Sequence, residues 1–264
     1  MSALSQFVKR FPLLIYFILA YTFAWAFYPL IKISAVYGVP GLFAPAVAAI
    51  IVCWLAGGRL SVNRLLGTLS VWRIHVIWYV MALGLPMALT LVVALLSRFF
   101  GADPALAFAP ITPLALIFFV LVVGEEIGWR GFAQPQLENR FSPFVAAVFL
   151  GVVWGIWHLP NFFVPELPHS EIPLAAFVLY TVGFSVIAAW LVKSSRGSVL
   201  IATLFHGASN TFGFLTPSLD AATRWWLLGG VYCAAALVVT AVYGIRLSQV
   251  SSSENAAALA KGQA

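Results

Sequence analysis

The sequence predicts an all-α protein, a bundle of about eight transmembrane helices with both termini in the cytoplasm. Hydrophobic residues make up 62% of the 264 and charged residues 8%, whereas a soluble domain carries about 25% charged residues. The mean hydropathy is +1.01. The apolar segments are also long and uncharged, which is typical of membrane helices and not of the short alternating strands of a barrel.

The first apolar segment imitates a signal peptide. It has a basic pair at Lys9 and Arg10, an apolar run, and small residues around Ala24, which is the order of parts in a cleavable leader. The apolar run continues to Ile31, and this length is enough to span a bilayer. We therefore expect an uncleaved first helix.

Eight apolar runs, separated by Pro, Gly or charged residues, justify the number of spans. In chain order they are about Pro12–Ile33, Pro40–Ala56, Ile74–Ser97, Leu114–Ala133, Pro143–Leu159, Leu174–Val192, Ser198–Leu215 and Trp225–Ile245. Between the second and third, Arg59–Arg73 has apolar residues at helical spacing and is expected to form an amphipathic helix in the membrane interface. Residues 1–247 are thus expected to form one bundle, and residues 248–264, which are small and polar, a disordered cytoplasmic tail.

The basic residues predict the orientation of the bundle. With the N-terminus inside, eleven basic residues fall on inner segments and three on outer ones, and positive charge favours the cytoplasmic side. The inner ones are Lys9, Arg10, Arg59, Arg64, Arg73, Arg130, Arg140, Lys193, Arg196, Arg246 and Lys261; the outer ones are Lys32, Arg98 and Arg224. These charges lie between spans and not in one cluster, which predicts that the partner is a lipid bilayer and not a nucleic acid. The bilayer expected is the cell (inner) membrane.

Two adjacent carboxylates, Glu125 and Glu126, follow the apolar run 114–123. A charge at the bilayer centre is unfavourable by about 2.5–3.5 kcal/mol on insertion scales. Arg130 lies four residues after Glu126 and can form an ion pair with it on one helix face, whereas Glu125 has no such local partner. One interpretation is that the pair marks a helix end in headgroup water; the other is a functional site, because intramembrane carboxylates are functional by default.

Further polar residues occur on two other spans. His158 lies close to a stripe of small residues, Ala147, Gly151 and Gly155, that suits close helix contact. His206 and Asn210 are one turn apart and share a face. A single membrane histidine is often just an interhelical hydrogen bond, but polar groups on three spans would impose the same desolvation problem three times. This pattern favours a common site.

The remaining polar residues are weaker candidates. His75 beside Arg73 is expected at the interface, and Glu138 with Arg140 reads as an ordinary inner-loop pair. The loop between spans five and six is expected to be solvated, with its residues outside any catalytic site; these are Glu166, His169 and Glu171.

The three motifs, Glu125-Glu126-xxx-Arg130, His158, and His206-xxx-Asn210, resemble in this order the CPBP intramembrane proteases. That family includes the type II CAAX prenyl endopeptidases and the bacteriocin-processing or immunity (Abi) proteins. The resemblance covers about residues 114–215, the expected catalytic core. One departure is Trp154, where the family's second motif usually has Phe; because an aromatic replaces an aromatic, we expect it to affect packing more than chemistry. The resemblance implies that Glu125 and His158 activate water, and that His206 and Asn210 hold the oxyanion.

Chemical reasoning assigns the same roles. Amide hydrolysis without a nucleophilic side chain needs a base for water and donors aimed at the oxyanion. Glu125 can be the base, His158 can help hold the water, and His206 with Asn210 can donate together, while Glu126 and Arg130 support the site. The chain has no Gly-x-Ser-x-Gly and no His-Glu-x-x-His, which disfavours serine proteases and ordinary zincins.

Two histidines and one glutamate are also a legitimate zinc set. One divalent metal such as zinc could therefore be held by Glu125, His158 and His206, and the sequence leaves this open. Three functions are compatible with this sequence. The first is an endopeptidase acting near the cytoplasmic side on a membrane-associated peptide or protein, either a CAAX protein or a leader peptide. The second is a non-catalytic scaffold or immunity protein of the same fold, and the third a small proton-coupled transporter.

Overall fold

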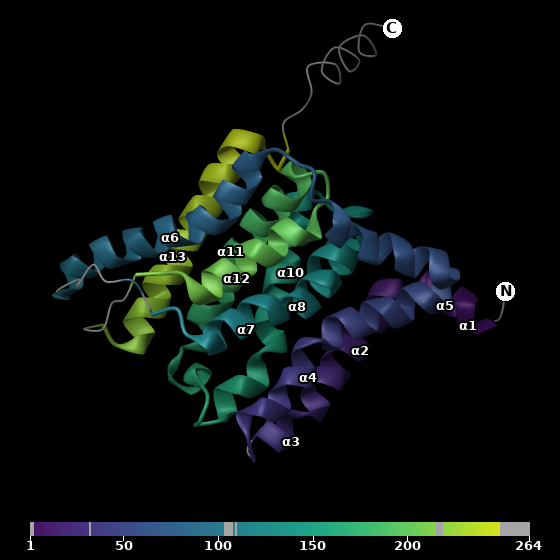
Figure 1. Cartoon of the computed structure of the whole chain (residues 1–264), viewed down its shortest axis with the longest axis horizontal. Helices are drawn as coiled ribbons and strands as arrows, with labels where there is room; N and C mark the ends of the chain where they lie inside the picture. The colour runs from purple at the N-terminus through teal and green to yellow at the C-terminus, as the bar shows by residue number, and fades with distance from the viewer. Residues whose placement is uncertain (1–2, 32, 103–107, 109, 215–218, 249–264) are drawn as a thin grey trace, which may run out of the picture.

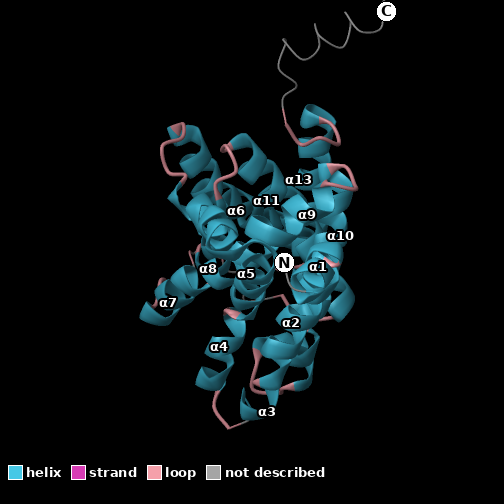
Figure 2. Cartoon of the chain, turned by 90° about the vertical axis from the view of Figure 1, so that its right-hand side faces the viewer, coloured by secondary structure: helices cyan, strands magenta, loops and turns pink. Residues whose placement is uncertain are grey.

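The computed structural model describes residues 3–31, 33–102, 108, 110–214 and 219–248. The expected disordered tail lies outside the described residues, except for residue 248. Helices make up almost all of the described chain, as Figure 2 shows, and its β-structure is an isolated bridge between Phe108 and Phe214. The predicted all-helical, polytopic class is confirmed.

Capping side chains explain where several of the helices begin. Thr112 accepts from Ala115 N–H at 3.1 Å before α7, and Asp220 accepts from Thr223 N–H at 2.9 Å before α13. Such caps satisfy the free N–H groups of a first turn. The helices are α1 (Ala3–Arg10), α2 (Pro12–Ala26), α3 (Tyr28–Ile31), α4 (Val39–Leu42), α5 (Ala44–Gly67), α6 (Val76–Leu96), α7 (Pro113–Leu121), α8 (Val123–Gly128), α9 (Gln134–Glu138), α10 (Pro143–Trp157), α11 (Leu174–Ser194), α12 (Val199–Thr211) and α13 (Ala221–Tyr243).

The number of membrane-length helices differs from the eight expected. Six helical segments of the described chain are long and apolar enough to cross a membrane: Pro12–Ile31, Val36–Ser70, Val76–Phe100, Pro143–Phe163, Leu174–Ser194 and Ala221–Tyr243. The expected span 114–133 is divided between α7, α8 and a π-helical turn, Trp129–Ala133. The expected span 198–215 is the 13-residue α12. At 1.5 Å per residue α12 is about 20 Å long, which is short of the roughly 30 Å hydrocarbon core.

The amphipathic segment after the second span is helical up to Gly67, as predicted, and a kink at Gly58 separates it from the first part of α5. The helix is interrupted at Gly58, whose φ of +62° is a left-handed conformation that glycine adopts readily. Trp72, which was expected on the same helix, lies beyond its end.

The core is built around α11, which packs against α10 and α13 and also contacts α12. In Figure 1, α6 and α13 form one flank, α1, α2 and α5 the other, and α8, α10, α11 and α12 lie between them. The small-residue stripe of α10 faces α11 as expected: a Cβ at Gly151 would lie 2.6 Å from Val182 Cα. Large apolar side chains remain exposed on the outer helices, among them Leu14, Trp54 and Leu237. An exposed apolar surface of this kind is typical of lipid contact, and the chain is an integral membrane protein.

Candidate active site

The two adjacent carboxylates lie on α8, at the centre of the bundle. Glu125 is 3% exposed and Glu126 is fully buried. Two glycines bring α8 close to the start of α5, because a Cβ at Gly124 would lie 2.8 Å from Leu42 O and one at Gly128 would collide with the backbone of Pro45. A π-helical turn follows directly, and π-turns are frequent at functional sites.

The predicted ion pair between Glu126 and Arg130 is confirmed, with 3.0 Å between Glu126 Oε1 and Arg130 Nη1. The same Oε1 also lies 2.7 Å from His206 Nδ1. The other guanidinium nitrogen of Arg130, Nη2, donates a hydrogen bond to Ser185 Oγ at 2.9 Å. Glu126 therefore joins α8 to α12, and Arg130 joins the π-helical turn to α11. The four-residue spacing predicts the supporting role of Glu126 through Arg130 alone, and the contact with His206 adds a second partner.

Trp154 of α10 holds the other carboxylate. Its indole Nε1–H donates to Glu125 Oε2 at 2.7 Å. Its ring lies edge-on to the His206 ring at 5.2 Å between centroids, and the Arg130 guanidinium lies 4.8 Å above it. The expectation that Trp154 affects packing more than chemistry is therefore incomplete, because a phenylalanine has no N–H to donate. In the sequence, the sign of this role was that tryptophan carries an N–H donor and the usual phenylalanine does not.

His158 follows the last turn of α10 and is half-buried. Its Nδ1 lies 2.9 Å from the Trp154 carbonyl oxygen. Since a carbonyl oxygen only accepts, Nδ1 must carry the hydrogen, and in a neutral ring Nε2 is then left with a free lone pair. Trp154 thus positions both expected water-activating residues, Glu125 through its side chain and His158 through its backbone.

His169 is close to the site, contrary to the expectation that it is solvated and remote. It lies in the short turn Pro168–Glu171, and its ring stacks on that of His158 with 5.8 Å between centroids and 17° between planes. Burial lowers the pKa of His169 to about 4, which keeps the ring neutral near pH 7. Spacing could not reveal this contact, because the loop folds back over its own helix end. Glu166 and Glu171 are exposed, as expected.

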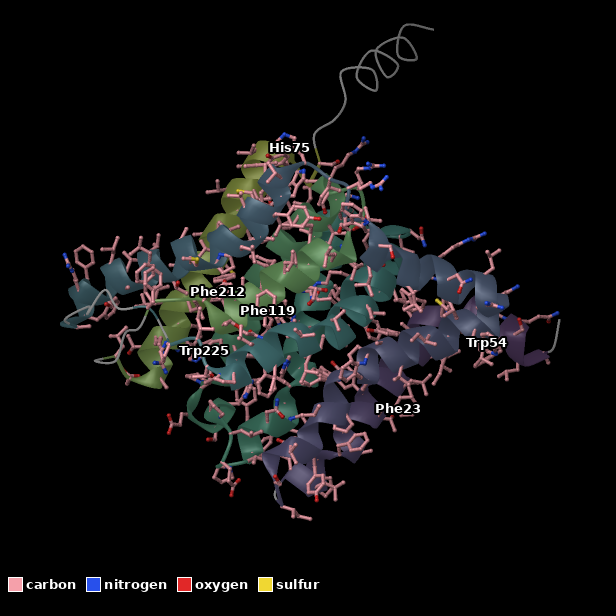
Figure 3. All side chains as sticks on the ribbon, viewed as in Figure 1. Phe23, Trp54, His75, Phe119, Phe212 and Trp225 are labelled. Carbon is pink, nitrogen blue, oxygen red and sulfur yellow. The ribbon has the colours of Figure 1, made fainter. Side chains whose placement is uncertain are left out.

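His206 and Asn210 lie one turn apart on α12. His206 is 4% exposed, whereas Asn210 is exposed and forms no side-chain hydrogen bond with the described residues. Between them, a Cβ at Gly207 would lie 2.8 Å from the ring of Phe119 on α7. Phe119 and Phe212 lie beside each other, 5.8 Å between centroids (Figure 3). The amide of Asn210 is thus free to bind an incoming group.

The sequence leaves open whether Glu125, His158 and His206 hold a metal ion, and this stays a prediction. Within the described ranges, no three His, Cys, Asp or Glu side chains form a group that could hold a metal ion. His206 Nδ1 faces Glu126, and His158 Nδ1 faces a carbonyl, so the two imidazoles are oriented by protein groups.

Comparison with known proteins shows which family and which relatives this chain is similar to. Residues 107–212 match the family model of the Rce1-like type II CAAX prenyl endopeptidases. The chain is 27% identical over 186 residues to CAAX prenyl protease 2 of Methanococcus maripaludis, an alignment that covers 63% of this chain and 67% of that protein. It is 30% identical over 108 residues to lysostaphin resistance protein A of Staphylococcus aureus, covering 40% of this chain and 24% of that protein.

The matched segment contains Glu125, His158, His206 and Asn210. The chain spans about two thirds of the archaeal relative and about a quarter of the staphylococcal one. Over residues 107–212, the chain is similar to the Rce1-like type II CAAX prenyl endopeptidases, the resemblance that its three motifs predicted.

Proposed function

We propose that this protein is an intramembrane endopeptidase that hydrolyses a peptide bond with a water molecule activated by Glu125. One observation carries the proposal most strongly: Glu125 is buried, one of its oxygens is held by the Trp154 N–H, and His158 and His206 both contact that same tryptophan. A carboxylate in a largely water-excluded position, held by the same tryptophan that contacts His158, is suited to general-base catalysis.

The first step is the attack of water. Trp154 occupies Glu125 Oε2, and Oε1 takes one proton from the water while the lone pair of His158 Nε2 orients it. The water oxygen bonds to the substrate carbonyl carbon, and the carbonyl π electrons move to its oxygen. In the second step the C–N bond breaks, the oxyanion reforms the carbonyl, and the proton on Glu125 passes to the leaving nitrogen. Glu125 is then a carboxylate again.

His206 and Asn210 would stabilise the oxyanion between these steps. Because Nδ1 of His206 faces Glu126, its donor toward substrate must be Nε2–H, and both nitrogens then carry hydrogen. The ring is consequently an imidazolium in this role, and the Glu126 carboxylate stabilises its charge. Asn210 contributes a neutral N–H from the next turn. Glu126 therefore acts on the oxyanion through His206.

The substrate class that the family match favours is a prenylated CAAX peptide, and a leader peptide is the other class considered. A panel of internally quenched peptides would test both: a farnesylated CAAX peptide, the same peptide without the lipid, and an unrelated leader-type sequence. We expect purified protein in detergent to release a fragment that mass spectrometry assigns to one cut, with Glu125→Gln protein as the blank. Folded wild type that cleaves none of them would contradict the proposal.

Metal dependence can be tested in the same assay. If side chains alone activate the water, we expect a strong zinc chelator to leave the rate unchanged. A loss of rate that is restored by added zinc would instead assign Glu125, His158 and His206 as ligands.

A second candidate is a non-catalytic membrane factor, favoured by the name of the staphylococcal relative, a resistance protein. Glu125→Gln would leave such a function intact, and it would abolish a function that depends on proteolysis.

A further inference from the structure

A polar cavity lies away from the carboxylates, where α1 meets α2. Its volume is about 270 Å³. The end of α1 and the first turn of α2 line it, together with one residue of α9 and two residues that follow α9. Its polar lining consists of three cations and two amides: Lys9, Arg10, Arg140, Gln136 and Asn139. The lining contains no carboxylate. The cavity is therefore built to receive negative charge.

The two guanidinium groups have no acidic partner among the described residues. Arg10 lies over the Phe11 ring at 5.2 Å, and neither Arg10 nor Arg140 forms an ion pair with a carboxylate of the described residues. Glu138, the acid nearest in sequence to Arg140, is engaged by Lys193 at 2.8 Å and by Gln134 at 2.8 Å. Like charges around one cavity repel each other, and an anion between them removes that repulsion.

The donor chemistry fits phosphate. A guanidinium group presents N–H donors in a planar fork that binds phosphate oxygens in pairs. The amides of Gln136 and Asn139 can add neutral donors. The first turn of α2, a 15-residue helix whose N-cap residue Phe11 makes no side-chain cap, also contributes to the lining.

An exposed apolar stripe leads away from this cavity along α2. Its members are Phe11, Leu14, Ile18 and Trp25, which are 38%, 56%, 55% and 37% exposed. Their spacing of three, four and seven residues places them on one face of the helix. A cationic cavity at the head of such a stripe matches a phospholipid, whose phosphate is joined to long apolar chains.

We propose that this cavity binds the phosphate of an anionic phospholipid, whose acyl chains lie along the exposed face of α2. A net-negative headgroup is favoured over a zwitterionic one, since the lining offers three cations and no carboxylate to a choline group. The site lies beside the predicted cytoplasmic segments, where basic pockets bind acidic lipid headgroups.

Thermal unfolding in detergent tests the proposal, with phosphatidylglycerol, phosphatidylcholine or inorganic phosphate added at the same molar concentration of phosphorus. We expect phosphatidylglycerol to raise the melting temperature of the wild type more than the other two do. In Arg10→Gln/Arg140→Gln, the phosphatidylglycerol concentration for half the shift should rise about tenfold or more, as expected for the loss of two cation contacts. Arg59→Gln/Arg64→Gln, with the same change in charge on the exposed part of α5, should behave as wild type.

Arg10→Lys/Arg140→Lys controls for a folding failure, because it keeps both positive charges and removes only the planar guanidinium groups. This variant should show an intermediate loss. The proposal is wrong if Arg10→Gln/Arg140→Gln keeps the full lipid shift, or if Arg59→Gln/Arg64→Gln loses as much. An equal shift with phosphatidylcholine would exclude selection by headgroup charge, and an equal shift with inorganic phosphate would assign the cavity to free phosphate.

Discussion

Trp154 contacts several of the candidate catalytic side chains, which is more than a role in apolar packing requires. It donates to Glu125, its carbonyl accepts from His158, and its ring lies against His206 and beneath Arg130. At the scale of single residues, the site is thus organised by a residue that takes no part in the proposed proton transfers. It is a positioning residue.

Trp154→Phe should separate positioning from packing. The substitution keeps an aromatic ring and removes the donor to Glu125. A hydrogen bond to a charged group contributes about 1.5–3 kcal/mol, so kcat should fall about tenfold to a hundredfold with KM little changed. Trp157→Phe is the matched control, because it removes an N–H whose partner is the Ala20 carbonyl on α2. An unchanged kcat in Trp154→Phe, with Glu125 still essential, would contradict the positioning role.

At the scale of elements, α12 presents two donors from one face, His206 in the buried interior and Asn210 at an exposed position one turn later. If His206 and Asn210 serve one oxyanion, each alanine variant should lose about 10²–10³ in kcat. The double variant should lose less than the product of the two, since residues that act as a unit are not additive. Ser209→Ala, on the same helix, is the control. Independent, multiplicative losses would show that the two residues do not stabilise the same atom.

The contact between α10 and α11 gives the second prediction at this scale. An alanine Cβ at position 151 would lie 2.6 Å from Val182 Cα and 2.8 Å from the Thr181 carbonyl oxygen. Backbone atoms cannot yield as a flexible side chain can, so Gly151→Ala should destabilise the protein by about 1–3 kcal/mol. Gly84→Ala on α6 meets no heavy atom within 4 Å and should be neutral in the same melting experiment. Equal melting temperatures would mean that the helices can separate freely here.

Prediction from sequence succeeded within single helices and failed between them. Apolar runs located most of the helices, and four-residue spacing paired Glu126 with Arg130, because both signals depend on neighbours along one helix. The contacts from Glu126 to His206 and from Trp154 to Glu125 join residues 80 and 29 positions apart. They depend on how each helix is rotated against the next, which periodicity does not specify. The divided span around Glu125 was missed for a related reason, since hydropathy does not register a π-helical turn.

At the scale of the whole molecule, segments predicted to be cytoplasmic meet at one end of the bundle. Ser198 Oγ donates to the Val71 carbonyl at 2.7 Å, Arg196 donates to the Arg73 carbonyl at 3.3 Å, and Lys193 pairs with Glu138. The contacts agree with the placement of these segments on one side of the membrane. Which side that is remains a prediction from the basic residues.

Single cysteines would test the orientation, in a background carrying Cys53→Ser and Cys233→Ser. Ser70 and Ser170 are both exposed and lie on opposite predicted sides. Ser170→Cys should react with a membrane-impermeant maleimide in intact cells, and Ser70→Cys only after the cytoplasmic face is opened. The reverse pattern would invert the bundle, and protection of both in intact cells would refute the predicted topology.

The central claim is that Glu125 activates the attacking water, and the kcat of Glu125→Gln tests it most directly. Glutamine keeps the shape and polarity of the side chain but cannot accept the proton. We predict that kcat falls by about 10²–10⁴, the range for general-base catalysis, while peptide binding and the melting temperature match wild type. Glu166→Gln, at an exposed loop carboxylate, should cleave normally. Cleavage by Glu125→Gln at the wild-type rate would contradict the mechanism.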